Sequence, residues 1–398
     1  MTGHVRRRGE RSWELKYDIG SDSNGRRKTR YASFKGSKRD AAIELARLIA
    51  TAAAGEQVDP SRITVAEFLK RWDTDWCKSN VSPKTRERYE ELMRLHVAPH
   101  VGAVRLQKLR PVQLAELYGT LAAKLAPRTI GHVHRVLHQA LSQAVEWDLL
   151  TTNVADRVQP PRVEDEEVEI LTVGQLKAAM AAVREGWINP IAKLALATGL
   201  RRGELLALRW KDLDTDKARI TVARSLEQTK AGLRFKEPKT KRGRRTISLP
   251  ATAVNDMRAH WRDQQEIRLR LGAGKSPPDS LVFCDLNGDP RLPQTVSQTW
   301  AKLTHKAGVE ATFHSLRHTH ASHLIAAGVD ILTISRRLGH SSPTVTLHIY
   351  GHLMPQTDDR AATAIEAALS ASSTEEEQIG PITGGNPVAM APAGLKDI

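Results

Sequence analysis

Cysteine and long hydrophobic runs are scarce in this sequence of 398 residues. Its two cysteines, Cys77 and Cys284, lie far apart and form no CxxC pair, so they indicate no disulfide framework and fit a reducing compartment. No run approaches the ~20 apolar residues of a membrane helix. A secretory signal requires an apolar segment after its basic residues, and none follows the basic N-terminus here. We therefore expect a cytoplasmic protein that does not use a membrane.

Acidic residues are too few to balance the basic ones. Lys and Arg together number 60 against 45 Asp and Glu, which gives a formal net charge of +15 and a pI near 9.9. Such an excess predicts a polyanionic partner, because neutralising phosphates releases the counterions condensed on a nucleic acid. A basic protein with an ordinary solvated surface is the alternative interpretation.

Residues 1–55 have the pattern of a small basic α/β module. Apolar residues alternate with polar ones at Trp13, Leu15, Tyr17 and Ile19. A turn signal at 21–25 leads into a basic strand, and Ser37 begins a helix that can cover the sheet. We predict a three-stranded sheet plus one helix, with a charged strand suited to a DNA groove; a solvated sheet face is the alternative. The candidate DNA contacts are Arg26, Arg27, Lys28 and Arg30.

Residues 62–158 follow helical spacing between two polar linkers, 56–63 and 159–167. Thr64 and Glu67 form a capping-box pattern, and Ser82-Pro83 places a cap residue before a first-turn proline. From Pro127 the apolar residues recur with the period of a helix. We predict an all-α domain that contacts DNA. Its candidate contacts are Lys84, Arg86, Arg88 and Arg128.

Residues 168–370 read as a mainly helical domain with a small β-sheet, and the stretch from Ala371 onward is expected to be disordered. Four segments of this domain carry chemistry: 197–205, 238–250, 314–319 and 338–350. They combine residues that suit phosphodiester cleavage. Arginine matches two phosphate oxygens with its planar fork, tyrosine can attack phosphorus, and lysine can protonate a leaving oxygen.

The local spacing is compatible with one site. His314 and Arg317 are three apart, hence on one helical face. Lys241 falls at an expected hairpin tip, and Glu204 is expected to pair with an arginine of its own helix rather than to act as a base. Histidines at 314, 318, 320 and 323 have partly helical spacing, but the lack of a nearby Cys or well-placed carboxylate argues against a metal site. We expect neither a metal nor a cofactor.

The order of these residues resembles the signature of the tyrosine recombinase (phage integrase) family. The stretches ATGLRRGEL, HSLRHTHAS and LGHSSPTVTLHIY are similar to that family's motifs. The resemblance is specific over about 170–355. It is weaker over 64–158, which looks like the family's core-DNA-binding domain. It is weaker again over 1–55, which is similar to the family's arm-type module. The matching catalytic set is Arg201, Lys241, His314, Arg317, His340 and Tyr350.

This resemblance implies a mechanism and partners. Tyr350 would form a 3′-phosphotyrosyl bond, while Arg201 and Arg317 clamp the scissile phosphate and His340 donates a hydrogen bond to it. His314 is implied in proton transfer with Tyr350, and Lys241 in protonating the 5′-oxygen, although Lys239 and Arg242 are close alternatives. The implied partners are double-stranded attachment sites, three further copies of the chain in a tetramer, an excision factor and a host DNA-bending protein.

Three other functions remain open at this point. A transposase of a conjugative element would use the same chemistry, and a DNA-binding regulator would bind without cleaving. A type IB topoisomerase also uses a similar tyrosine site, but it has no need of an arm module. The arm-like module favours an integrase of a phage or mobile element over a chromosome-dimer resolvase, which would normally lack such a module.

Overall fold

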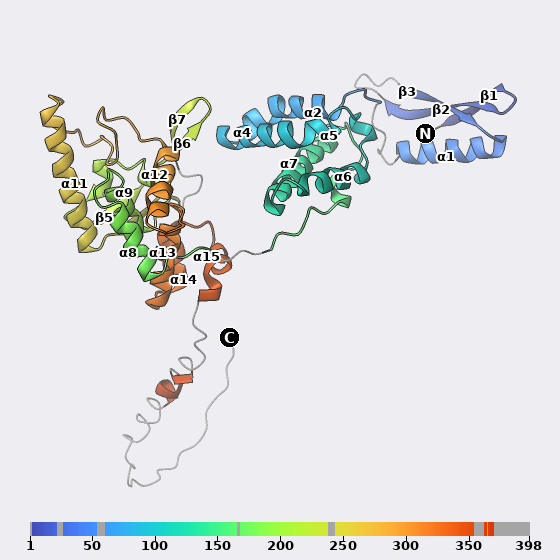
Figure 1. The fold of residues 1–398 in the computed structure, drawn as a ribbon. Helices are drawn as coiled ribbons and strands as arrows, with labels where there is room; N and C mark the ends of the chain where they lie inside the picture. Colours follow the sequence, from blue (N-terminus) through green and yellow to red (C-terminus); the bar gives the residue numbers. More distant parts are fainter. Residues whose placement is uncertain are drawn as a thin grey trace, which may run out of the picture.

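The computed structural model describes residues 2–21, 27–53, 60–164, 168–237, 243–353, 362–363 and 365–369. Within these residues the chain forms an N-terminal sheet backed by a helix, then a bundle of helices, then a mainly helical region with two small sheets (Figure 1). This order confirms the predicted fold class. Each of the three regions has its own hydrophobic core.

The N-terminal region is an antiparallel sheet of order β1-β2-β3. Its strands are Gly3–Gly9, Ser12–Ser21 and Arg27–Lys35, and α1 spans Lys38–Ala53. Helix α1 covers one face, where Leu15 and Tyr17 pack against Ala41 and Leu45, as the alternating pattern predicts. The hydroxyl of Ser37 accepts from the Asp40 backbone N–H at 3.2 Å and caps the helix.

The middle region is all helical, and its boundaries follow the predicted caps. Thr64 and Glu67 form the capping box, and Ser82 accepts from Thr85 N ahead of Pro83. The apolar stripe of the helix that begins at Pro127 lies in the core. The elements are α2 (Val65–Trp72), the π-helical segment η1 (Asp73–Cys77), α3 (Lys78–Asn80), α4 (Pro83–Leu92), the π-helical segment η2 (Met93–Val97), α5 (Ala98–Val101), η3 (Leu106–Lys108), α6 (Pro111–Ala122), α7 (Pro127–Glu146) and η4 (Val154–Arg157).

The C-terminal region packs helices around a core that includes Trp300, Phe313 and Leu316. Its first helices and turns are α8 (Val173–Ala182), α9 (Asn189–Thr198), α10 (Arg202–Leu205) and η5 (Trp210–Asp212). Its strands are β4 (Leu213–Asp214), β5 (Arg219–Val222), β6 (Ser225–Thr229), β7 (Gly232–Lys236) and β8 (Arg245–Ser248). It ends with α11 (Ala251–Arg270), α12 (Pro293–Lys306), α13 (Ser315–Ala326), α14 (Ile331–Leu338), α15 (Pro343–Tyr350) and η7 (Gly351–Leu353).

The strands around Lys241 do not form the predicted hairpin. Strand β7 pairs with β6, whereas β8 pairs with β5 in a separate sheet of order β4-β5-β8. A hairpin with Lys241 at its tip would require β7 and β8 to pair with each other, so this expectation is wrong. Lys241 itself lies outside the described residues, as does the tail from Ala371 that we expect to be disordered.

The middle and C-terminal regions touch through the tip of the β6–β7 hairpin (Figure 1). The Lys230 backbone N–H donates to Glu87 at 2.6 Å, and its ammonium lies 3.0 Å from Glu90, both on α4. In the part of the chain that the structure describes, no helix is both long and apolar enough to cross a membrane.

Candidate active site

Arg317 is the most buried charge of the predicted site. It lies on α13 with 3% of its surface exposed. Its guanidinium donates to the Gly199 carbonyl at 2.6 Å and to the Leu338 carbonyl at 2.8 Å. Burial and then the neighbouring Arg201 charge lower the pKa of Arg317 to about 9. Arg317 therefore remains positively charged at neutral pH.

Two glycines that end helices α9 and α14 make this anchoring possible. Gly199 and Gly339 have φ of 65° and 68°, the left-handed conformation in which the last turn of a helix leaves carbonyls without partners. A Cβ at Gly199 would lie 2.6 Å from His320, and one at Gly339 would lie 2.6 Å from the Arg245 guanidinium. Glycine is therefore required at both positions for conformation and for space.

Arg201 is held beside Arg317 by the same turn. Its Nη2 donates to the Gly339 carbonyl at 3.1 Å, next along the chain from the Leu338 carbonyl that Arg317 uses. Its Nη1 donates to Glu204 at 3.0 Å, which confirms the expected pairing within the helix. The Arg201 side chain is 42% exposed. The two guanidiniums thus share adjacent carbonyls, and Arg201 is the one open to solvent.

A second buried arginine completes the support of Arg201. Arg245, at the start of β8, donates to both carboxylate oxygens of Glu204 at 3.1 and 2.9 Å, and to the Arg337 carbonyl at 2.7 Å. Burial alone would raise the pKa of Glu204, but Arg245 and Arg201 hold that pKa below its ordinary value. Glu204 is therefore a buried carboxylate that accepts from two arginines.

Tyr350 is the last residue of α15 and is fully buried. Its hydroxyl lies 2.8 Å from Nδ1 of His318, one residue after Arg317 on α13. Burial raises the pKa of Tyr350 to about 12, against the lowering effect of the Arg317 charge. Burial and then Arg317 lower the pKa of His318 to about 4, so His318 is neutral in the DNA-free protein.

Two further histidines border this pair. His314, the N-cap residue of α13, is exposed and packs edge-on against His318 with ring centroids 4.7 Å apart. Surrounding protein and then the charges of His318 and Arg317 lower the pKa of His314 to about 4. His340 lies 2.7 Å through Nδ1 from the Thr346 hydroxyl, and burial with the nearby arginines lowers its pKa to about 3.

The structure brings five of the six predicted catalytic residues into one cluster. Three separate segments meet there: the turn before α10, helix α13, and the stretch from the end of α14 to the end of α15. The sixth residue, Lys241, lies outside the described residues. The cluster contains Arg201, His314, Arg317, His340 and Tyr350.

Two residues of the cluster were missed from the sequence. His318 was considered only as a metal ligand, and Arg245 was one of many basic residues in its segment. No local pattern marks either one, because their partners lie 32 and 41 positions away. Among the described residues, no group of three or more His, Cys, Asp or Glu is arranged to hold a metal ion.

The predicted DNA contacts of the middle region fall into two groups. Arg86 makes a two-point ion pair with Asp73 at 2.9 and 2.7 Å, so it ties α4 to η1. Lys84 and Arg88 make more exposed ion pairs, with Glu87 and Glu91. They also line a hollow of about 610 Å³ between α4, α7 and the β6–β7 hairpin, as do Arg135 and Lys236. Arg128 is exposed at the start of α7.

The N-terminal sheet presents a basic face that sequence reasoning did not identify. Register places Arg30 opposite Tyr17, on the face that α1 covers. Arg6, Lys16 and Lys35 are exposed on the opposite, open face. Arg26 lies outside the described residues, and nothing is described of the Arg27 and Lys28 side chains.

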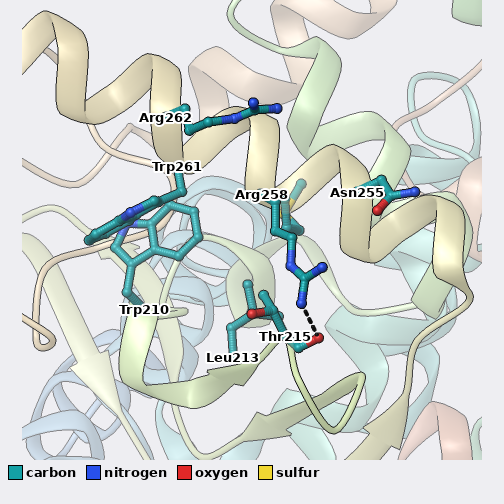
Figure 2. A pocket seen from close by; sticks show the side chains of 8 residues that line it. Trp210, Leu213, Thr215, Asn255, Arg258, Trp261 and Arg262 are labelled. Atoms are coloured by element: carbon teal, nitrogen blue, oxygen red, sulfur yellow. Dashed lines mark hydrogen bonds between the residues drawn. The ribbon is translucent and has the colours of Figure 1, made fainter.

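A separate hollow of about 680 Å³ lies on α11, and none of the cluster residues lines it (Figure 2). Trp210 and Trp261 meet edge to face there with centroids 4.6 Å apart. Arg258 donates to the Thr215 carbonyl at 3.2 Å, so its guanidinium is used to hold a turn. The hollow shares no residue with the chemistry around Tyr350.

Comparison with known proteins matches two parts of the chain. Residues 169–357 match the phage integrase family, and residues 64–122 match the N-terminal SAM-like domain of phage integrases. An integrase of Streptomyces ambofaciens is 30% identical over 85% of this chain and 88% of its own length. A XerC-like tyrosine recombinase of Caldanaerobacter subterraneus is 26% identical over 89% of this chain and 95% of its own length.

Solved structures show the same fold. The Tn1549 transposon integrase in complex with transposon right end DNA has a TM-score of 0.64 at 23% identity, over 77% of this chain and all of that one. A lambda integrase tetramer bound to a Holliday junction has a TM-score of 0.56 at 18% identity, over 86% of this chain and 96% of that one.

Proposed function

Because the chain belongs to the phage integrase family, and is thus a tyrosine-type recombinase, we propose that it integrates or excises a phage or mobile element through a covalent 3′-phosphotyrosyl intermediate at Tyr350. The observation that carries the assignment to this residue is the cluster itself. The fold places the Tyr350 phenol against His318 and within the field of Arg317. It also brings the guanidinium of Arg201, from a distant segment, beside that of Arg317.

The two arginines bind the scissile phosphate. Their planar forks match phosphate oxygens, and their charge stabilises the negative charge that develops on those oxygens in the transition state. Metal ions supply this charge in many nucleases. Arg201 is the accessible member of the pair and makes first contact with DNA. Arg317 is held by two carbonyls, so its guanidinium is already in position and needs little reorganisation when the phosphate binds.

The remaining groups handle protons. The Tyr350 oxygen attacks phosphorus, the bond to the 5′-oxygen breaks, and Lys241 protonates that leaving oxygen. His340 donates a hydrogen bond to the phosphate from Nε2 when its Nδ1 accepts from Thr346. His314 takes part in proton transfer at the open side of the site. Religation reverses these steps with a new 5′-hydroxyl, because the phosphotyrosine ester conserves the energy of the bond it replaces.

The other regions position the DNA. We assign residues 1–55 to arm-site binding, 62–158 to core-site binding, 168–370 to catalysis, and 371–398 to a tail. The open face with Arg6, Lys16 and Lys35 supports the first assignment, and the basic hollow beside α4 and α7 supports the second. Relatives have been seen bound to DNA and as a tetramer on a Holliday junction, which supports a homotetramer here.

A transposase of a conjugative element would use the same site. The similarity to the Tn1549 transposon integrase and to the ICEBs1 integrase of Bacillus subtilis keeps this second function open. A regulator without catalysis would bind DNA and form no covalent adduct. The ends of the element that carries the gene distinguish integrase from transposase, and the adduct distinguishes both from a regulator.

The experiment uses the full chain and a nicked duplex that spans the junction of the element's two ends. After cleavage, the nick releases the short strand, so the covalent protein–DNA adduct accumulates and is seen on a denaturing gel. Tyr350→Phe should abolish the adduct while DNA affinity in a gel shift stays within a few-fold. An adduct that persists in the Phe variant would assign the nucleophile to another residue.

A further inference from the structure

We propose that His318 is the proton acceptor of Tyr350, an inference that rests on the proposed function and deepens it. The resemblance implies His314 in this role, but Nδ1 of His318 is the group that lies 2.8 Å from the Tyr350 hydroxyl. Because that nitrogen touches the attacking oxygen itself, His318 is a catalytic residue in this account.

The geometry fixes which atoms exchange the proton. In the tautomer with hydrogen on Nε2, Nδ1 of His318 has a free lone pair and accepts from the phenol. As the Tyr350 oxygen forms its bond to phosphorus, its proton moves to Nδ1 and His318 becomes an imidazolium. The bond between phosphorus and the 5′-oxygen breaks, and Lys241 gives that oxygen a proton. Religation returns both protons, so the cycle consumes none.

The surroundings favour a neutral His318 before the reaction. On its own helix it faces the Arg317 cation and the ring of His314, and on the neighbouring segments it faces His340 and Tyr350. Positive neighbours and burial disfavour protonation, so the lone pair is available at neutral pH. A bound phosphate raises the pKa of His318 again, which improves it as a base at the moment of attack.

The other charged groups near α13 are engaged elsewhere. Arg337 on α14 donates to His320 at 3.0 Å, on another part of the helix, and to backbone carbonyls. Glu204 is bound by Arg201 and Arg245, and Glu169 accepts from Ser315 at the start of α13. His352, on the η7 turn that contacts α13, is exposed.

His314 has a different place in this arrangement. Its residue is exposed and its ring meets that of His318 edge-on, whereas His318 is only partly exposed. It can pass on a proton or contact the phosphate, whereas the group at hydrogen-bond distance from the Tyr350 hydroxyl is Nδ1 of His318. The two histidines, four residues apart on one helix face, are therefore not interchangeable.

The test measures single-turnover cleavage of the nicked duplex between pH 5 and 9. A general base contributes roughly 10²–10⁴ in rate, so His318→Asn should slow cleavage at least about 100-fold. Asparagine keeps a polar group near the position of Nδ1 but cannot take a proton. The wild-type rate should fall as pH drops through the pKa of His318 in the complex, and His318→Asn should lose that fall. Imidazole should restore part of the rate of His318→Ala.

Controls separate this role from others. His323→Asn changes an exposed histidine of the same helix and should leave the rate and the pH profile unchanged. Near wild-type cleavage by His318→Asn, with slow cleavage by His318→Ala, would reduce His318 to a positioning residue and overturn the proposal. The proposal would also be overturned if the fall in cleavage rate at low pH disappeared in His314→Asn but remained in His318→Asn.

A second measurement does not depend on activity. Nitrogen NMR of the wild-type protein at pH 7 should show His318 neutral, with hydrogen on Nε2 and an Nδ1 signal that shifts in Tyr350→Phe. Hydrogen on Nδ1 would mean that His318 donates to the phenol and cannot accept from it, which overturns the proposal. Absence of any adduct with the wild-type protein would instead contradict the proposed function itself.

Discussion

Replacement of Glu204 by glutamine tests the electrostatic framework behind the site. The carboxylate of this residue accepts four hydrogen bonds: one from the Arg201 backbone, one from the Arg201 side chain, and two from Arg245. Both Glu204 and Arg245 are buried, with side chains 8% and 7% exposed. Glutamine has the same shape, so the substitution removes charge without leaving a cavity.

The expected cost follows from this burial. Removing one partner of a buried ion pair costs about 3–5 kcal/mol, because the other charge stays buried without compensation. In addition, the amide NH2 of glutamine is a hydrogen-bond donor, so it cannot accept from the arginine N–H groups that face it. Glu204→Gln should therefore lower the unfolding free energy of the C-terminal region by about 3 kcal/mol. The same change at Glu90, whose pair with Lys230 is largely exposed, should cost no more than about 1 kcal/mol.

The effect should also depend on pH, with a definite sign. The buried Glu204 carboxylate accepts from Arg245 and Arg201, and these arginines hold its pKa in the folded protein below its ordinary value of 4.5 against the opposing effect of burial. A lowered folded pKa contributes stability that is fully present above the unfolded pKa and is lost as pH falls through the folded pKa. The difference in unfolding free energy between wild type and Glu204→Gln should thus be constant from pH 7 down to about 5 and shrink below about 4.5.

The assay combines urea unfolding with hydrogen exchange of peptides from α10 and β8, which assigns the change to this part of the chain. A double-mutant cycle with Arg245→Met measures the pair itself. Single and double variants should deviate from additivity by more than about 1 kcal/mol, because the residues are in direct contact. Additive effects within about 0.5 kcal/mol, or a loss at Glu204 no larger than at Glu90, would refute the reasoning.

Two further predictions concern other parts of the chain. Replacing Arg6, Lys16 and Lys35 together by alanine should weaken arm-site DNA binding. Each phosphate contact contributes about 0.9 to the slope of log affinity against log salt, so the slope should fall by up to about 3. A gel shift over a salt series measures the slope, which would stay unchanged if the open face does not bind DNA. Gly339→Ala places a Cβ 2.6 Å from the Arg245 guanidinium on a residue whose φ is 68°. It should slow adduct formation at least about tenfold, while core-site affinity in a gel shift is retained. Adduct formation at the wild-type rate would show that this turn does not hold the arginines.

Local sequence signals predicted much of the fold. The capping residues Ser37, Thr64 and Ser82 begin helices where expected, since a cap involves groups only two or three positions apart. Alternation along β2 and helical periodicity from Pro127 identified the buried faces. The family resemblance then selected five residues that the fold brings into one cluster.

Contacts between distant segments could not be predicted in this way. Spacing within α13 places His314 and Arg317 on one side of the helix, but it does not say which histidine reaches Tyr350 on α15. The helix propensity of α4 does not reveal that Arg86 is paired with Asp73 rather than free for DNA. The hairpin expected at Lys241 was wrong because two strands that follow each other in the sequence need not pair with each other.

The way in which the fold stabilises its clustered cations explains why these distant contacts matter. Arg201 and Arg317 are bound by carbonyls at the C-terminal ends of α9 and α14, where the partial negative charge of a helix is greatest. A carboxylate pointing into the site would neutralise the arginines more strongly, but it would also repel a phosphate. Among the described residues, Glu204 is the one acidic residue that is buried, and Arg245 binds it as well as Arg201, so its negative charge is balanced by a second arginine. The site can therefore keep a net positive charge in the folded protein, and this charge stabilises the phosphate when DNA binds.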